Sequence, residues 1–299
     1  NLTYFFKSNW ALGKKLALKE LNLAIEPGES FGFLGHNGAG KTTTIKCILN
    51  LILPSSGAIN IFGIPSQNPL ARQQVGFVPE QPYFYDHLRV GEIVEMYARL
   101  SGVPSSEVKN KVGRAVALLG LSDRIKSPMR TLSKGLIQRV AMAQAIVHQP
   151  RLLILDEPFS GLDPLGRKEF ADLIFNLKEK GTTIFMSSHI LGDVEFICDR
   201  ASIMVKGAIK GIYDLKHLTD QTHGRYHLGV KSAHIVKEQL RELSDTSTDH
   251  EGLLHLEFDS AANAQKALRI AAEKAEVHYF RFQHGGLEEL FVKLVKEEV

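Results

Sequence analysis

Cysteine is scarce in this sequence of 299 residues, and long apolar runs are missing. The two cysteines, Cys47 and Cys198, lie in apolar surroundings without metal-ligand spacing. This favours reduced core thiols of a cytosolic protein over a disulfide framework or a zinc site. No run approaches the roughly 20 apolar residues that cross a bilayer, and no signal peptide opens the sequence. The first residue is Asn1 rather than Met, which suggests that it is not the natural start. If the protein acts at a membrane, we expect another subunit to span that membrane.

A strong net charge is also absent, since the formal charge at pH 7 is only +3. A charge this small gives no reason to expect a nucleic acid as a direct partner. Hydrophobic residues make up 44% of the chain and charged residues 23%, which is typical of a globular protein with a proper core. The length allows one large domain and one small one. We find no long internal repeat and no low-complexity segment.

The strongest motif is a glycine-rich stretch at residues 35–43, which fits the spacing G-x-x-x-x-G-K-[ST]. A short apolar run at residues 30–34 precedes it, and apolar residues at helical spacing follow it. This strand–loop–helix context favours a phosphate cradle over a coincidental turn, because backbone N–H groups gather at a helix N-terminus. Lys41 can then reach the β- and γ-phosphates, and the Thr42 hydroxyl can bind Mg²⁺. The cradle consists of Gly35, His36, Asn37, Gly38, Ala39, Gly40, Lys41, Thr42 and Thr43.

Two further buried strands end in polar residues. Four consecutive aliphatic residues at 152–155 predict a strand buried on both faces, and Asp156 and Glu157 follow it. Acids at the carboxyl edge of a parallel sheet, together with a phosphate loop, are typical of Mg²⁺–nucleotide sites. We expect Asp156 to orient Mg²⁺ and Glu157 to polarise the attacking water, although such acids can also be merely solvated. Residues 182–188 predict another buried strand, after which His189 could reach the γ-phosphate; a lone histidine is otherwise usually structural.

The rest of the chain predicts the domain organisation. An aromatic cluster at residues 4–6 could stack on a nucleotide base or simply fill a sheet core. Residues 216–299 read as a small α+β domain without visible catalytic chemistry. We expect strands at residues 2–6, 16–25, 58–63, 75–78, 201–205, 208–212, 225–230 and 253–258, mainly helices at 88–149, and helices near 236–243, 264–271 and 287–294.

The motifs together resemble the cytosolic ATP-binding subunit of an ABC transporter over residues 1–215. The specific mark is Leu132-Ser133-Lys134-Gly135-Leu136, followed by Gln138-Arg139. It is similar to the family's LSGGQ signature, in the LSKG form frequent among subunits that serve ABC-2-type exporters. Ser133 and Gly135 begin a predicted helix, so their N–H groups form a second anion site. A lone Ser-x-Gly would be an ordinary helix cap.

The resemblance also implies roles for residues that no local pattern identifies. It places the D-loop at residues 160–163, with Asp163 beside the dimer partner, and makes His189 the switch histidine. Phe6 matches the base-stacking aromatic, with Tyr4, Phe5 and Trp10 as alternatives. The chain departs from the family at two places. Glu80 occupies the position of the Q-loop glutamine and Gln81 follows it, so either could meet Mg²⁺. Leu136 replaces the last glutamine of the signature.

The resemblance implies an α/β fold: a P-loop NTPase core of ABC ATPase type with an antiparallel β subdomain and an inserted helical subdomain at about 86–149. The core domain would span residues 1–215.

We expect an ATPase that binds ATP and Mg²⁺, dimerises and drives a separate membrane permease, most often an exporter, from the inner face of the cell membrane. A soluble ABC ATPase acting on ribosomes or DNA is the alternative; such proteins usually carry two ATPase units or a coiled-coil insert. A P-loop kinase fits the signature poorly, and a non-catalytic regulator would not need Glu157 and His189.

Overall fold

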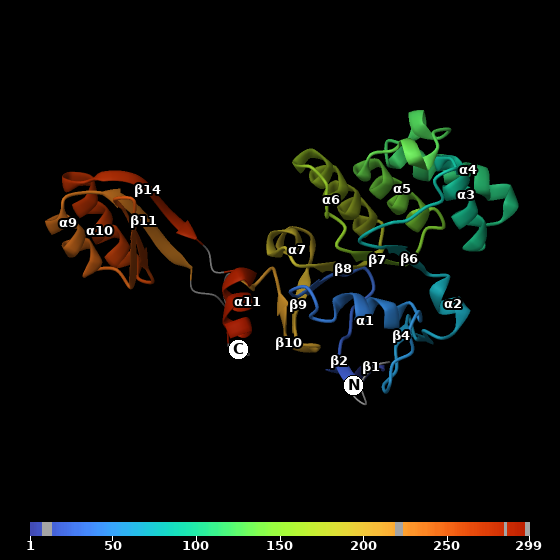
Figure 1. Cartoon of the computed structure of the whole chain (residues 1–299), viewed down its shortest axis with the longest axis horizontal. Coiled ribbons are helices and arrows are strands. Elements are labelled where there is room, and N and C mark those ends of the chain that lie inside the picture. Colours follow the sequence, from blue (N-terminus) through green and yellow to red (C-terminus); the bar gives the residue numbers. More distant parts are fainter. Residues whose placement is uncertain (8–13, 219–223, 284–285, 297–299) are drawn as a thin grey trace. The chain divides into compact units, whose positions relative to one another are not determined.

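The computed structural model describes residues 1–7, 14–218, 224–283 and 286–296 (Figure 1). The chain divides into two compact units, Asn1–Asp214 and Leu215–Val299. Each unit has a hydrophobic core of its own. Within the described ranges, no helix combines the length and the apolar character that crossing a bilayer requires.

The first unit is built on a six-stranded sheet in which five neighbouring strands are parallel and one edge strand is antiparallel. The two central strands are wholly buried, as their near-continuous apolar sequences predict for a sheet covered on both faces. Phe31 and Phe185 stack there with ring centroids 6.3 Å apart. In sheet order the strands are β10 (Ala208–Asp214), β9 (Arg200–Val205), β3 (Ser30–Leu34), β8 (Thr183–Ser188), β7 (Leu152–Asp156) and β6 (Val75–Val78).

This topology brings three chemically important loops to one edge of the sheet. Strand β8 pairs with β3 on one side and with β7 on the other. The carboxyl ends of these three parallel strands therefore lie side by side, at the edge where α/β proteins bind ligands. The helices that follow them are α1 (Lys41–Ile48), α6 (Pro164–Glu179) and α7 (Leu191–Ile197).

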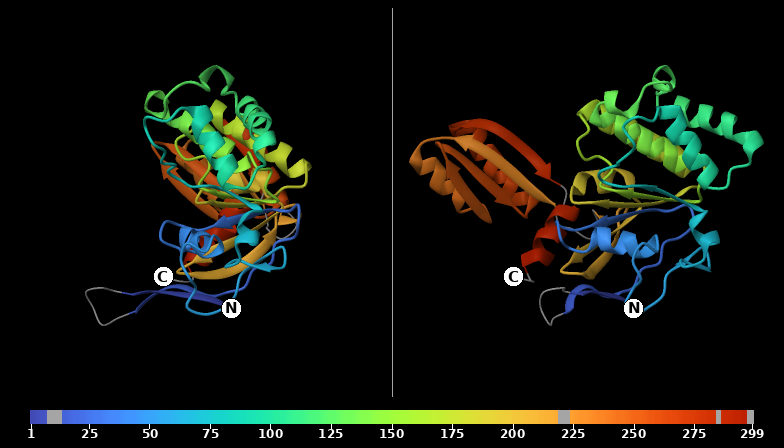
Figure 2. Two further views of the ribbon diagram at one scale, coloured as in Figure 1. Left: turned by 90° about the vertical axis from the view of Figure 1, so that its right-hand side faces the viewer. Right: turned by 45° about the vertical axis from the view of Figure 1, so that its right-hand side comes forward.

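An antiparallel subdomain and a helical subdomain flank this sheet on opposite sides (Figure 2). The first contains the hairpin β1 (Leu2–Lys7) and β2 (Lys14–Leu21), the two-residue strands β4 (Asn60–Ile61) and β5 (Ile64–Pro65), and α2 (Pro69–Arg72). The strand predicted at 58–63 is shorter than expected, because Phe62 and Gly63 adopt positive φ angles of 48° and 80° and reverse the chain.

The helical subdomain is an insertion between β6 and β7. It consists of α3 (Val90–Leu100), α4 (Ser105–Leu118) and α5 (Lys134–Ile146), with 3₁₀ turns at Ser122–Arg124 and Met129–Thr131 between α4 and α5. The apolar side of α3 is buried against α4 and α5. Together with the parallel sheet, this insertion confirms the predicted α/β fold class.

The second unit contains a four-stranded antiparallel sheet in the order β12-β13-β11-β14. With its two interspersed helices this is the β-α-β-β-α-β arrangement of ferredoxin-like domains. Alternate residues of the central strands pack on α9 and α10, which lie side by side in Figure 1. The elements are β11 (Arg225–Lys231), α9 (His234–Arg241), β12 (Thr246–His250), β13 (Leu253–Phe258), α10 (Ala261–Lys274), β14 (Glu276–Gln283) and α11 (Leu287–Lys296).

Candidate active site

The glycine-rich stretch forms a tight loop between the buried strand β3 and helix α1. Gly40 precedes the helix with φ 113°, a conformation that side chains rarely adopt. A Cβ at Gly35 would lie 2.8 Å from the Met204 carbonyl oxygen, and one at Gly40 would lie 2.7 Å from the Met204 side chain. Gly35 therefore allows the loop to approach the β9 backbone, whereas Gly40 is required by its backbone conformation. The loop presents the first N–H groups of α1 at the sheet edge, as a phosphate site requires.

Lys41 is the first residue of α1 and is almost completely buried. Its ammonium donates a hydrogen bond of 2.6 Å to the Gly35 carbonyl oxygen. It also lies 3.3 Å from Glu157 Oε1. A buried ammonium must have partners of this kind, because an unpaired charge is costly to remove from water.

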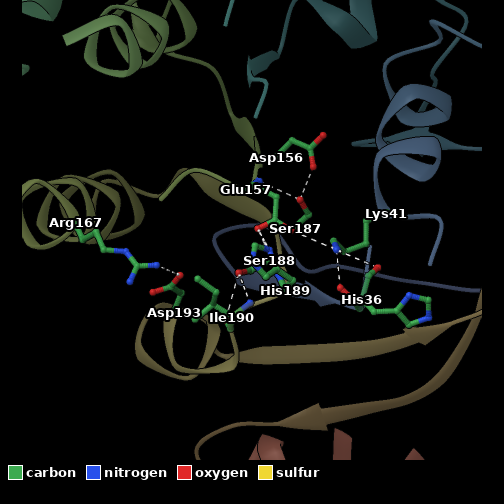
Figure 3. Close-up of polar contacts among 11 residues, drawn as sticks. His36, Lys41, Asp156, Glu157, Arg167, Ser187, Ser188, His189, Ile190 and Asp193 are labelled. Carbon is green, nitrogen blue, oxygen red and sulfur yellow. Dashed lines mark hydrogen bonds and ion pairs between the residues drawn. The ribbon is translucent and has the colours of Figure 1, made fainter. Parts of the chain in front are cut away.

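Glu157 and His189 are in contact across the ends of β7 and β8 (Figure 3). Glu157 Oε2 lies 2.8 Å from His189 Nδ1 and accepts a 3.3 Å hydrogen bond from the His189 backbone N–H. The Glu157 N–H donates to the Ser187 carbonyl and hydroxyl oxygens, at 3.2 Å each. Glu157 itself has φ 48°, which is unusual for a residue other than glycine and often found at functional sites. The register that pairs β7 with β8 thus fixes the carboxylate beside the imidazole.

Asp156, at the end of β7, is buried. Its Oδ1 accepts a 2.5 Å hydrogen bond from the Ser187 hydroxyl, and no other side-chain bond to this carboxylate is found within the described residues. Carboxylate and hydroxyl oxygens are the ligands that Mg²⁺ prefers, usually few in number and completed by phosphates and waters. Asp156 and the exposed Thr42 hydroxyl supply ligands of this kind. No cluster of three or more His, Cys, Asp or Glu side chains suited to a metal occurs in the part of the chain that is described.

A hollow of about 480 Å³ lies beside the phosphate cradle. Phe6 lines it and is 45% exposed, with its ring 5.0 Å from that of Tyr4. Glu80 also lines this hollow. Tyr4, Phe5 and Gln81 are not among the described residues that line it. Trp10, the remaining candidate for base stacking, lies outside the described residues. The lining residues are Phe6, Lys15, Leu16, Ala17, His36, Asn37, Gly38, Gly40, Lys41, Thr42, Thr43, Glu80, Glu157, Lys206 and Gly207.

Two parts of this hollow are absent from the sequence-based prediction: residues 15–17 of β2, and the turn between β9 and β10. The strands predicted at 201–205 and 208–212 imply a hairpin with its turn at Lys206 and Gly207, but the sequence gives no sign of where this turn packs. In the structure the Gly207 N–H donates to the Ala39 carbonyl oxygen at 2.9 Å, and the Gly207 carbonyl accepts from the Lys19 N–H at 2.8 Å. These two bonds hold the turn and β2 against the phosphate cradle.

The signature stretch lies elsewhere in the same unit. Ser133 caps α5, and its hydroxyl accepts a 3.4 Å hydrogen bond from the Leu136 N–H. The Lys134 side chain lies against Gly161, where an added Cβ would come within 2.4 Å of its Nζ. Ser133, Lys134, Gly135 and Asp163 are all missing from the described lining of the 480 Å³ hollow. Each chain therefore has two separate helix N-termini that could bind anions.

Burial makes the one thiol near the cradle unreactive. Cys47 lies on α1 and is fully buried. Desolvation raises the pKa of its thiol from 9.0 to about 11, so the thiolate is not populated at neutral pH. Cys47 therefore serves as a small core residue, as the sequence predicts.

Comparison with known proteins agrees with this geometry. Residues 18–160 match the family model described as ABC transporter. An uncharacterized ABC transporter ATP-binding protein of Synechocystis is 44% identical over 96% of this chain and 81% of its own length. The bacitracin transport ATP-binding protein of Bacillus licheniformis is 34% identical over 95% of this chain and 94% of its own. Among solved structures, the dimeric ATP-binding cassette MJ0796 in a post-hydrolysis state with ADP and Pi has 25% identity and a TM-score of 0.66, covering 72% of this chain and 97% of that one.

Proposed function

Because this chain belongs to the ABC transporter family of ATP-binding proteins, we propose that two copies close around two ATP molecules and drive export through a separate membrane permease. The chain is an ATP-binding ATPase subunit of the ABC type. The proposal concerns the dimer, the permease, the direction of transport and the role of each residue.

The observation that carries the proposal is the convergence of Lys41, Glu157 and His189 at one edge of the sheet. Lys41 would turn from Glu157 to the β- and γ-phosphates once ATP occupies the cradle. Glu157, released from the ammonium, would then accept a proton from the attacking water as general base. His189 would stay hydrogen-bonded to the other Glu157 oxygen, Oε2, and would reach the γ-phosphate from the end of the neighbouring strand.

Residues in and around the cradle also fit the remaining parts of the nucleotide. Thr42 and Asp156 would hold Mg²⁺, with Glu80 or Gln81 as a further ligand; Glu80 is favoured because it lines the hollow. The bound cation would neutralise charge on the phosphate oxygens. Phe6 lines the hollow, which supports it as the aromatic that would contact the base.

A site shared between two chains explains why the signature stretch lies apart from the cradle. Ser133 and Lys134 are exposed, and neither belongs to the described lining of the ATP hollow. In our proposal they bind the γ-phosphate held by the cradle of the second copy, and Gly135 and Asp163 also face that nucleotide. The dimeric state of the MJ0796 cassette supports this arrangement.

The relatives support the proposed permease and export direction. The bacitracin transport protein is similar to this chain over nearly its whole length. No membrane-spanning helix occurs within the described ranges, so we assign the membrane passage to a partner subunit. The chain would then act at the inner face of the membrane, and the permease would select the cargo.

The test combines dimerisation with capture of the partner. The Glu157→Gln variant, which should bind ATP without hydrolysing it, is sized by chromatography with and without MgATP; we expect a dimer only with ATP. Tagged wild-type chain is then purified from detergent-solubilised membranes of its source. A stoichiometric protein with several membrane spans would support the proposal, and ribosomes or DNA in its place would overturn the transport role. A monomer at saturating ATP would overturn the shared site.

A further inference from the structure

The helices that follow the Glu157 loop and His189 are joined by one ion pair. Arg167, in the first turn of α6, places Nη2 3.0 Å from Oδ2 of Asp193, in the first turn of α7 (Figure 3). The Asp193 side chain is only 17% exposed and that of Arg167 36%. This contact is therefore partly withdrawn from solvent, unlike the ion pairs on the outer helix surfaces.

Each member of the pair is rigidly connected to one functional loop. The Arg167 N–H donates to the Asp163 carbonyl oxygen at 2.9 Å, and the Gly166 N–H donates to Asp163 Oδ1 at 2.9 Å. On the other side, α7 begins two residues after His189, and the Ser188 hydroxyl accepts a 2.9 Å hydrogen bond from the Ile190 N–H. A shift of either helix is thus transmitted to residues 159–163 or to His189.

The pair also forms part of the wall around the reactive side chains. A second hollow, of about 230 Å³, is lined by both members of the pair, by Glu157 and His189, and by the loop 159–162. Burial raises the pKa of Asp193, and the Arg167 charge opposes that rise. Arg167 is confined as well: its Nε is buried without a hydrogen-bond partner in the described structure, and its guanidinium lies 5.9 Å from the Phe159 ring.

We propose that the Arg167–Asp193 ion pair is a positioning device that fixes His189 and the loop 159–163 relative to Glu157. It rests on the proposed function, because the roles of Glu157, His189 and Asp163 belong to that proposal. Neither Arg167 nor Asp193 lines the 480 Å³ hollow beside the cradle, so we expect their replacement to leave ATP binding at the cradle nearly unchanged. Turnover should depend on this pair, because displacement of a reacting group by about 1 Å can lower the reaction rate about 10²-fold.

The kinetic test separates positioning from binding. In Asp193→Asn and Arg167→Gln we expect kcat to fall about tenfold to a hundredfold, with the ATP dissociation constant within about twofold of wild type. Arg167→Lys, which keeps the charge, should recover part of the loss. The matched control is Lys178→Gln, which removes an ion pair of similar burial from the far end of α6 (Lys178–Asp199, 2.7 Å) and should keep wild-type kcat.

A second measurement does not depend on turnover. Amide hydrogen exchange, read by mass spectrometry, should accelerate in peptides covering 158–163 and 189–193 in Asp193→Asn and stay unchanged there in Lys178→Gln. Wild-type kcat in Asp193→Asn, or unchanged exchange in either peptide, would overturn the inference. A wild-type chain that binds ATP but shows no turnover would instead count against the proposed function, while the exchange data would still decide the positioning role.

Discussion

Glu157 Oε1 lies 3.3 Å from the Lys41 ammonium, so the proposed general base is paired with the lysine proposed to bind phosphate. Both side chains are nearly buried. In such surroundings each charge depends strongly on the other, and removal of one leaves the other uncompensated. In the proposed function, ATP brings its own negative charge to Lys41. We therefore expect phosphate binding and release of Glu157 to be parts of one exchange.

This exchange predicts the behaviour of Glu157→Gln. The amide keeps the shape of the side chain but cannot accept the proton, so turnover should fall by about 10²–10⁴-fold. ATP affinity should be equal to or greater than that of wild type, because Lys41 no longer has a carboxylate competing for it. Phosphate release measures the first effect and fluorescent-nucleotide titration the second. Glu179→Gln, an exposed change at the end of α6, is the control, and unchanged turnover in Glu157→Gln would remove this residue from the mechanism.

A second prediction concerns pH and the half-buried His148. Its Nε2 lies 3.2 Å from the Val75 carbonyl oxygen, and Nδ1 is buried without a partner among the described residues. Burial lowers the pKa of this imidazole below 6.5; the hydrogen bond to Val75 opposes this shift in part, and the nearby Lys111 charge adds to it. Between the lowered pKa and 6.5 the unfolded chain binds more protons than the folded one, so stability rises with pH across this window. Stability should therefore be lost as the pH falls below about 6.5.

The measurement is urea unfolding of wild type and His148→Gln between pH 5 and 7.5. Glutamine can still donate to Val75 but does not titrate, so the loss of stability on acidification should be smaller in the variant. The difference between the two proteins isolates this histidine from the other eleven, since the sequence contains 12. Identical acid dependence would show that His148 is not held neutral in the fold.

A third prediction concerns the second unit, which we propose to be regulatory or dimer-stabilising. Every residue assigned to ATP lies in Asn1–Asp214, and the ferredoxin-like unit has its own core. A chain ending at Asp214 should keep basal ATP hydrolysis within a few-fold of the full chain. Circular dichroism and thermal melting check first that it is folded. A folded truncation that no longer binds ATP would contradict this division of roles.

Local sequence patterns predict the buried strands and the phosphate cradle because those features depend on near neighbours. Four aliphatic residues before Asp156, and the glycine spacing before Lys41, require no knowledge of distant segments. The contact between Gly207 and Ala39 is different, since it joins residues far apart in the sequence that share no pattern. Strand β12 (Thr246–His250) was also not predicted; it is exposed along its whole length and shows no alternation of apolar residues.

The candidate site also combines features that local sequence patterns predict with contacts that depend on distant parts of the chain. Glu157 and His189 could be proposed from strand ends, since the order of a parallel sheet brings such ends together. The Arg167–Asp193 pair could not, because it depends on the packing of two helices against each other. Choosing Glu80 over Gln81 as the residue near the cradle likewise requires the path of the chain beyond β6.

The last prediction tests whether one ATP is bound by two chains. Lys41→Ala removes the cation from the cradle, and Ser133→Arg fills the second anion site at the start of α5. Loss of one preorganised contact of this kind typically costs about 3 kcal/mol of transition-state stabilisation, roughly 10²-fold. Homodimers of either variant should therefore fail at both sites.

Mixed dimers of the two variants distinguish the arrangements. If Lys41 and Ser133 of different chains serve one ATP, both lesions fall into one of the two sites and the other site is intact. If they serve the same ATP within one chain, both sites are damaged. We therefore expect a mixture of the variants to recover occlusion of about one ATP per dimer, measured by nucleotide retention because turnover can require both sites. The nucleotide retained by the wild-type dimer sets the upper limit, and the nucleotide retained by each variant homodimer sets the lower limit. Mixed dimers that are shown to form by two distinct affinity tags, yet retain no nucleotide, would rule out the shared site.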